Sequence, residues 1–116
     1  MIKTLAKSNL TYNASEELQN DEEVVLAAVT RDGWALKHSS EELRNNEEVV
    51  LAAVTQNGGA LKFAPEELQN DVEVVLAAVT QNGEAFQLAS EVLQDNAEVV
   101  QAAIMQLLTI QTLNMI

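Results

Sequence analysis

The sequence predicts an all-α fold, a short α-solenoid of about four helical repeats. Three observations predict it: residue patterns recur every 25 positions, helix start and stop signals recur with them, and aromatic residues make up only 3% of a chain rich in Val, Leu and Ala. A unit of this length cannot bury its apolar face alone. Neighbouring units are therefore expected to stack, each with a short helix, a short helical turn and a longer helix.

The period is clearest in two recurring blocks. Gly33, Gly58 and Gly83 are 25 positions apart, and the residues EVVLAAVTQNG at 48–58 recur unchanged at 73–83. A second block, of the type Ser-Glu-Glu-Leu, recurs in the same register at 15–18, 40–43, 65–68 and 90–93. The chain, 1–116, is therefore expected to be a single helical-repeat domain. Its expected parts are a degenerate N-terminal cap (1–13), repeats (14–38, 39–63, 64–88 and 89–104) and a C-terminal capping or dimerisation helix (105–116).

Each repeat carries the start signal of a longer helix. A glutamate stands three positions after each of Asn20, Asn45, Asn70 and Asp95. This is the spacing of a capping box. Aspartate or asparagine also stands one position later, so the long helices are expected to start near Asp21, Asn46, Asp71 and Asn96. The apolar run that follows also suits a buried strand. The acidic first turn, the paired alanines and the terminal glycine favour a helix.

Glycine and proline divide the rest of the unit. Asn57-Gly58 and Asn82-Gly83 follow helical runs, so they are interpreted as C-terminal caps in which the glycine takes a positive φ, rather than as hairpin turns. Pro65 disfavours α geometry in the residue before it. We therefore expect one short helix over 60–64 and a second turn over about 65–69, with 3₁₀ geometry as an option for the second.

The ordered succession of residues from 60 to 83 resembles a known family of tandem repeats, DUF4116, a domain of unknown function. The pattern is ALKFAPEELQND, then EVVLAAV, then Asn82-Gly83, and the resemblance covers roughly residues 10–104. It implies tandem short-helix repeats inside larger proteins, with no settled biochemical activity and no catalytic residues. The sequence departs from the family pattern at His38 and Leu88, where an aromatic residue is usual, at 10–13 and beyond Ile104. These departures imply that the first and last units are caps.

Composition and charge exclude several functions. Eighteen acidic against six basic side chains give a formal net charge of −12, whereas proteins that bind nucleic acid or anionic membranes need a basic face. The absence of cysteine excludes disulfides, cysteine nucleophiles and cysteine-based zinc sites. The first seven residues lack the apolar run of a signal peptide. We therefore expect a cytoplasmic protein that binds neither nucleic acid nor membrane.

Two residues are candidates for partner binding, Trp34 and His38. His38 aligns with Phe63 and Leu88 at the repeat period, so its simplest role is to fill space at a helix contact. It has neither a second histidine nor a cysteine to join it in a metal site. Trp34 aligns with a glycine and a glutamate, which indicates an exposed position that can anchor a partner. The simpler alternative is a tryptophan folded onto the first unit, where it covers apolar surface.

Recurrent glutamates are the remaining candidates for chemistry. They stand in the expected first turns of helices, where the helix dipole favours negative charge, at 16, 17, 41, 42, 66, 67 and 91. Acid–base catalysis and calcium binding are the alternatives. The sequence contains no Asp-rich calcium loop, phosphate loop, nucleophile elbow or dinucleotide fingerprint. We therefore expect a solvated acidic face on a non-enzymatic chain, with no catalytic residue, cofactor or metal.

The C-terminal segment departs most from the repeat. From Val99 to Ile116 it has no charged residue, and Leu108 replaces the glycine, so the last helix is expected to run on. A membrane span here would bury several glutamine, threonine and asparagine side chains, which argues against one. We expect either a cover over the last repeat or a homodimer seam. The apolar residues that would form the seam are Leu107, Leu108, Ile110, Leu113 and Met115.

The leading functional hypothesis is a non-catalytic protein-interaction scaffold, because stacked repeats expose an extended surface. The alternatives are a self-assembling structural protein and a regulatory fragment of a larger enzyme or effector-like protein. The expected partner is accordingly another protein or a second copy of this chain.

Overall fold

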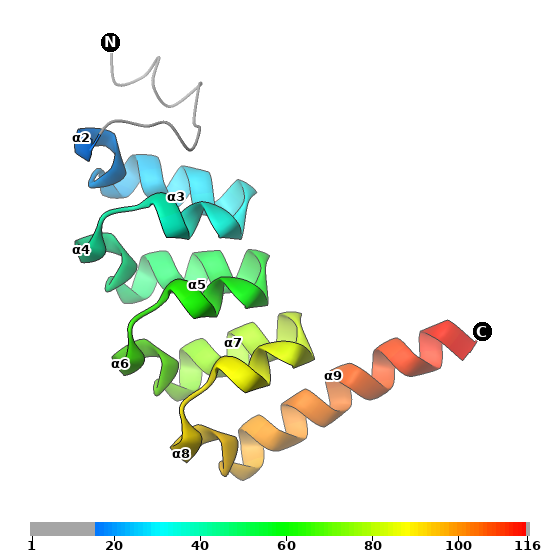
Figure 1. Cartoon of the computed structure of the whole chain (residues 1–116). Helices are drawn as coiled ribbons and strands as arrows, with labels where there is room; N and C mark the ends of the chain where they lie inside the picture. The colour runs from blue at the N-terminus through cyan, green and yellow to red at the C-terminus, as the bar shows by residue number, and fades with distance from the viewer. Residues whose placement is uncertain (1–15, 116) are drawn as a thin grey trace.

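The computed structural model describes residues 16–115, and within this range the chain is helical and has no β-strand. Helices recur in the order short α, long α, 3₁₀ (Figure 1). The short helices are α2 (Glu16–Gln19), α4 (Glu41–Arg44), α6 (Glu66–Gln69) and α8 (Glu91–Gln94). The long helices are α3 (Glu22–Arg31), α5 (Glu47–Gln56), α7 (Val72–Gln81) and α9 (Ala97–Met115). The 3₁₀ helices are η1 (Gly33–His38), η2 (Gly58–Phe63) and η3 (Gly83–Leu88).

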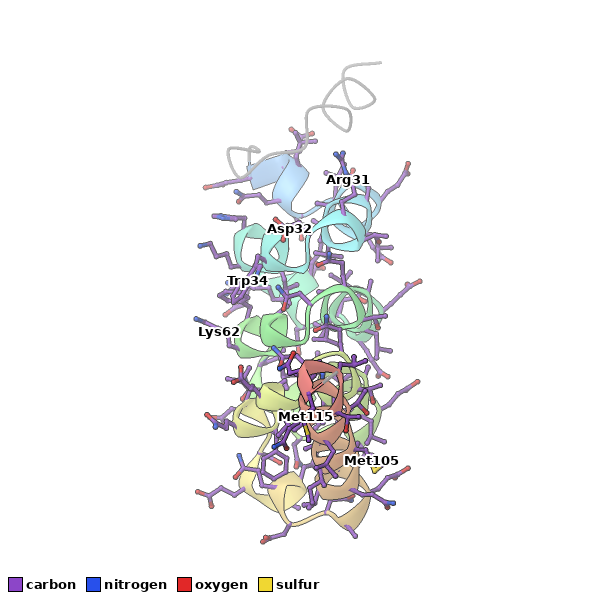
Figure 2. All side chains as sticks on the ribbon, turned by 90° about the vertical axis from the view of Figure 1, so that its right-hand side faces the viewer. Arg31, Asp32, Trp34, Lys62, Met105 and Met115 are labelled. Atoms are coloured by element: carbon purple, nitrogen blue, oxygen red, sulfur yellow. The ribbon has the colours of Figure 1, made fainter. Side chains whose placement is uncertain are left out.

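Successive units stack side by side. The long helices form one row, in which α3 packs against α5, α5 against α7 and α7 against α9 (Figure 1). The 3₁₀ helices form a second row beside the first, with η1 against η2 and η2 against η3 (Figure 2). The predicted all-α repeat solenoid is therefore confirmed.

The core lies between the two rows and is built from valine, alanine and leucine. Val29, Val54 and Val79 are equivalent at the repeat period and have no exposed surface. Leu36 and Leu61 of the 3₁₀ helices are equally buried. Helices α5 and α7 each pack against their own 3₁₀ helix and also against that of the preceding unit. A unit thus completes the core of its neighbour, so stacking is what buries the apolar faces.

The long helices begin where the sequence indicates. The N-cap residues are Asp21, Asn46 and Asp71, and each side chain accepts a hydrogen bond at 3.1 Å from the backbone N–H three positions on. Each cap lies one residue after the first residue of the expected capping box. The reason is that Asn45 and Asn70 instead end the preceding short helices as C-caps.

The glycines have a different role from the one expected. Among the described residues none has a positive φ, so the predicted left-handed C-cap is wrong. Asn57 ends α5 in an extended conformation with φ of −150°. Gly58 is required by close packing instead, because a Cβ atom there would lie 2.3 Å from the carbonyl oxygen of Ala78 on the next long helix. At Gly33 the corresponding distance to the oxygen of the next unit would be 2.5 Å.

The two short elements of each unit also have the opposite geometry to that expected. Residues 58–63 form a 3₁₀ helix that includes the glycines, whereas Glu66–Gln69 is α-helical. Pro65 precedes the α-helix as its N-cap, with φ of −69° and ψ of 164°. The side chain of Asn57 accepts a hydrogen bond from the N–H of Gly59 at 3.0 Å, and this bond stabilises the 3₁₀ start.

Helix α9 runs on past the repeat period, as expected. Leu107 and Leu108 stand where the preceding unit has Asn82 and Gly83, so the turn into a 3₁₀ helix does not form. The first half of α9 packs on α7 and η3, whereas its second half projects from the edge of the array (Figure 1). The expected N-terminal cap over residues 1–13 lies outside the described residues.

Candidate interaction surfaces

Trp34 forms a small aromatic cluster with the second repeat. Its ring meets that of Phe63 edge to face, with centroids 5.4 Å apart and planes at 73°. The ammonium of Lys62 lies 5.6 Å from the Trp34 ring centroid and 5.4 Å from that of Phe63. Trp34 and Lys62 lie on the same side of the 3₁₀ row (Figure 2). We call Trp34, Lys62 and Phe63 the aromatic cluster, which joins η1 to η2.

The two residues singled out for partner binding lie at opposite ends of η1. The indole of Trp34 is 39% exposed, so it covers apolar surface and stays accessible at the same time. The surface that it covers includes Phe63 and Gly59 of the second repeat. His38 is half-buried, as are Phe63 and Leu88 at the same register position. A partner-binding role for Trp34 and His38 stays a prediction.

A groove runs along the edge where the long helices end and the 3₁₀ helices begin. Its volume is about 590 Å³. The turns supply Asp32, Asn57 and Asn82, and the ends of the long helices supply Gln56, Gln81 and Gln106. Glu84 of η3 and Leu107 and Ile110 of α9 complete the lining. We call this feature the amide groove, after its five carboxamide side chains.

The glutamines of the amide groove connect neighbouring units. The backbone N–H of each turn glycine donates to a glutamine Oε1 of the next unit, at 2.5, 2.5 and 2.7 Å. These pairs are Gly33–Gln56, Gly58–Gln81 and Gly83–Gln106. These bonds were not among the predictions, although the sequence carries a signal for them. Glutamine stands at 56, 81 and 106, and it persists at 106 although the glycine of the repeat is lost at 108.

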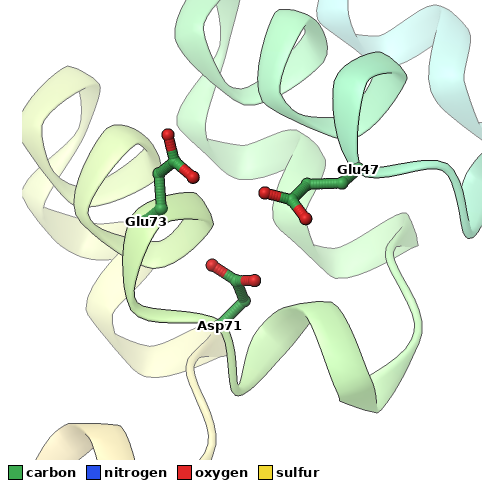
Figure 3. A group of neighbouring side chains, drawn as sticks. All are labelled: Glu47, Asp71 and Glu73. Atoms are coloured by element: carbon green, nitrogen blue, oxygen red, sulfur yellow. The ribbon is translucent and has the colours of Figure 1, made fainter.

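Three carboxylates meet where α5 packs against α7 (Figure 3). Oxygens of Glu47, Asp71 and Glu73 all lie within 4.8 Å of one another. The negative charge of Asp71 is the largest of the causes that raise the pKa of Glu47 above its ordinary value, followed by some loss of hydration and by Glu73. Asp71 already accepts a hydrogen bond from the N–H of Val74 as the cap of α7. Calcium takes about six to eight oxygen ligands, so these three residues form a site of charge repulsion more than a built cation cage.

Large apolar side chains gather on α9. In the described part of the chain most of the exposed large hydrophobic residues belong to this helix, with exposed fractions of 46–81%: Ile104, Met105, Leu107, Leu108, Ile110, Leu113 and Met115. Ile104 is 51% exposed, whereas Val79 at the same register position is fully buried. We call these seven residues the α9 apolar surface. None of the described helices combines the length and the apolar character that crossing a bilayer requires.

The stacked helices and their exposed edges define an all-α repeat solenoid. The chain belongs to the family DUF4116, a domain of unknown function, whose profile matches residues 7–44, 21–69, 46–94 and 71–107. The four overlapping matches confirm that the chain consists of tandem repeats of that domain. No curated protein and no solved structure matches the chain.

Proposed function

We propose that this chain is a non-catalytic protein-interaction scaffold. The observation that carries the proposal is the α9 apolar surface, whose side chains are 46–81% exposed and extend along a helix that projects from the array (Figure 1). A concentration of exposed apolar side chains is typical of contact sites for other proteins. The aromatic cluster and the amide groove add further accessible surface to the same rigid stack of repeats.

A second copy of the chain is the partner that charge favours at the α9 apolar surface. Residues 99–115 carry no charged side chain, whereas the whole chain has a net charge of −12. Two copies that pair through this segment keep their acidic helices apart. Burying one leucine contributes about 1.5–3 kcal/mol. Several leucines paired across a two-fold axis therefore offset an association cost of at least about 4 kcal/mol.

Light scattering at micromolar concentration tests self-association. We expect the full chain to be a dimer, and we expect both a Leu113→Glu/Met115→Glu variant and a chain ending at Leu108 to be monomers. Val92→Glu is the matched control, because Val92 is 71% exposed on α8 and earlier units have glutamate at this position. The control is expected to remain a dimer. A monomeric full-length protein refutes the dimer, and an unchanged dimer in both α9 variants places the interface elsewhere.

Affinity capture with the wild type and with Trp34→Ala distinguishes a scaffold for other proteins from a self-assembling protein. A scaffold is expected to capture a defined partner, and loss of that partner from a folded Trp34→Ala protein assigns the contact to the aromatic cluster. If neither protein captures a partner while both elute as oligomers, self-assembly is the better account.

A further inference from the structure

The hydrogen bonds of the amide groove fix the orientation of its glutamines. In a carboxamide only the oxygen can accept a hydrogen bond from a backbone N–H. The bonds from the turn glycines therefore hold Gln56, Gln81 and Gln106 by Oε1. The NH₂ group of each side chain is consequently turned away from the turn that its oxygen meets. None of the three NH₂ groups has an acceptor among residues 16–115.

The asparagines of the groove are oriented in the same way. Asn57 and Asn82 accept hydrogen bonds through Oδ1, at 3.0 Å, from the backbone N–H two positions on. Their NH₂ groups also have no acceptor within the described range. By contrast, the glutamines at 69 and 94 donate through Nε2 to backbone carbonyls inside the fold. The amide groove therefore presents a row of hydrogen-bond donors whose oxygens are already engaged.

We propose that the amide groove binds an extended, basic peptide segment in a polyproline II conformation, whose backbone carbonyls accept hydrogen bonds from this row. The proposal rests on the scaffold function and names a partner for one of its surfaces. A polyproline II chain has no internal hydrogen bonds, and it repeats every three residues, about 9 Å. Helices packed side by side lie about 8–10 Å apart. Successive units of the groove therefore contact the same face of such a chain. The backbone carbonyls of an α-helical ligand, by contrast, already accept hydrogen bonds within the helix.

The charge of the groove selects a basic segment. Asp32 and Glu84 line it, and no lysine or arginine is among the lining residues. The net charge of −12 attracts a basic ligand at longer range. Leu107 and Ile110 of α9 supply an apolar wall at one end of the groove. This wall fits proline rings and the aliphatic stems of lysine side chains.

Three synthetic peptides test the proposal with the full chain: four Pro-Pro-Lys triplets, four Pro-Pro-Glu triplets, and a helical peptide of Lys, Leu and Ala with the same positive charge as the first. The readout is the nuclear magnetic resonance signals of the side-chain NH₂ groups of Gln56, Asn57, Gln81 and Asn82 during titration. We expect only the Pro-Pro-Lys peptide to shift all four. No shift at millimolar peptide, or equal shifts with the helical or the acidic peptide, overturns the proposal.

An Asn57→Asp/Asn82→Asp variant separates the donor row from simple charge attraction. Aspartate keeps the turn, because Asp32 accepts the equivalent bond from the N–H of Trp34 at 3.0 Å, but it lacks the NH₂ group. We expect roughly tenfold weaker binding of the Pro-Pro-Lys peptide, because two hydrogen bonds are lost, although the added charge attracts lysine.

The control variant Asn45→Asp/Gln87→Glu adds the same charge at exposed positions outside the groove lining, and it is expected to bind the Pro-Pro-Lys peptide at least as tightly as the wild type. Equal or tighter binding by the groove variant refutes the donor row. If the peptide fails to bind while affinity capture with the full chain still yields a defined partner, the groove proposal fails and the scaffold proposal stands. If both experiments are negative, both proposals fail.

Discussion

The indole of Trp34 in the first repeat meets the ring of Phe63 in the second edge to face, with centroids 5.4 Å apart. Edge-to-face pairs contribute about 0.5–1.5 kcal/mol beyond the area that they bury. A double-mutant cycle with Trp34→Ala and Phe63→Leu is expected to give a coupling energy in that range in urea unfolding. Leucine is the conservative choice, because Leu88 stands at the equivalent position. Strictly additive effects of the two substitutions would contradict a direct contact.

Alanine substitutions at adjacent glycines test the close packing of the repeats. Gly58→Ala is expected to lower the free energy of unfolding by roughly 1–3 kcal/mol, because the new Cβ atom would lie 2.3 Å from the carbonyl oxygen of Ala78. Gly59→Ala is the matched control, since its Cβ atom would come no closer than 3.3 Å to a neighbouring atom. The control is expected to change stability by less than about 0.5 kcal/mol. Equal losses from both substitutions would contradict the assignment of the loss to the close approach at Gly58.

The raised pKa of Glu47 predicts a pH dependence of stability. The folded protein holds this proton more tightly than the unfolded chain, so the free energy of unfolding falls as pH rises from the ordinary glutamate range through the raised pKa. Glu47 is repelled by the charge of Asp71 only when it is ionised, so the repulsion develops as pH rises through the raised pKa. Glu47→Gln is therefore expected to be more stable relative to wild type at pH 7 than at pH 4.

Glu22→Gln is the control for this measurement. Glu22 also begins a long helix, so the control loses the same favourable interaction with the helix dipole. At its junction Asn46 takes the place of Asp71 in the repeat register. The stability difference between the two variants at pH 7 is expected to shrink in high salt, because screening weakens the repulsion. A Glu47→Gln protein less stable than Glu22→Gln at pH 7 would contradict the assignment.

Arg44 is expected to be a weak point of the second repeat. Its Nε atom is buried without a hydrogen-bond partner among the described residues. At the equivalent positions the NH₂ groups of Gln69 and Gln94 donate to the carbonyls of Leu61 and Phe86 at 3.1 and 3.2 Å. Arg44→Gln removes the buried, unpaired Nε and should raise the free energy of unfolding by about 0.5–1.5 kcal/mol. The gain does not depend on a bond to the carbonyl of Leu36, because the hydroxyl of Ser39 already donates to that oxygen at 2.7 Å. Thermal unfolding measures the effect. Arg31→Gln, an exposed substitution with the same charge change, should have little effect in that measurement.

The parts of the fold that depend on neighbouring residues could be predicted from the sequence. The starts of the long helices follow from side chains such as Asn46, which caps the backbone three positions away. The role of Gly58 could not be predicted, because the carbonyl that excludes a side chain belongs to another repeat. Glycine is common after helices for its positive φ, so the local pattern gave the wrong reason for the right boundary.

The candidate surfaces divide in the same way. The exposure of Leu113 and Met115 follows from a helix that outlasts the repeat, which is visible in the sequence. The amide groove depends on hydrogen bonds between residues 23 positions apart, such as Gly58 and Gln81. No pattern within one unit indicates whether the oxygen or the NH₂ group of a glutamine side chain forms the hydrogen bond to the neighbouring unit. The contact of Trp34 with the second repeat likewise required the three-dimensional arrangement.

The hydrogen bond from each turn glycine to the next unit's glutamine gives the array a direction. The turn at Gly33 is complete only when Gln56 is in place, and the turn at Gly83 only when Gln106 is. During synthesis from the N-terminus, every turn therefore waits for the long helix that follows it. Folding should advance along the nascent chain one unit behind translation. The most recently synthesised turn then always lacks the glutamine that completes it. Helix α9 completes the last described turn, because Gln106 accepts the hydrogen bond from Gly83. It lacks the glycine with which a further turn would begin.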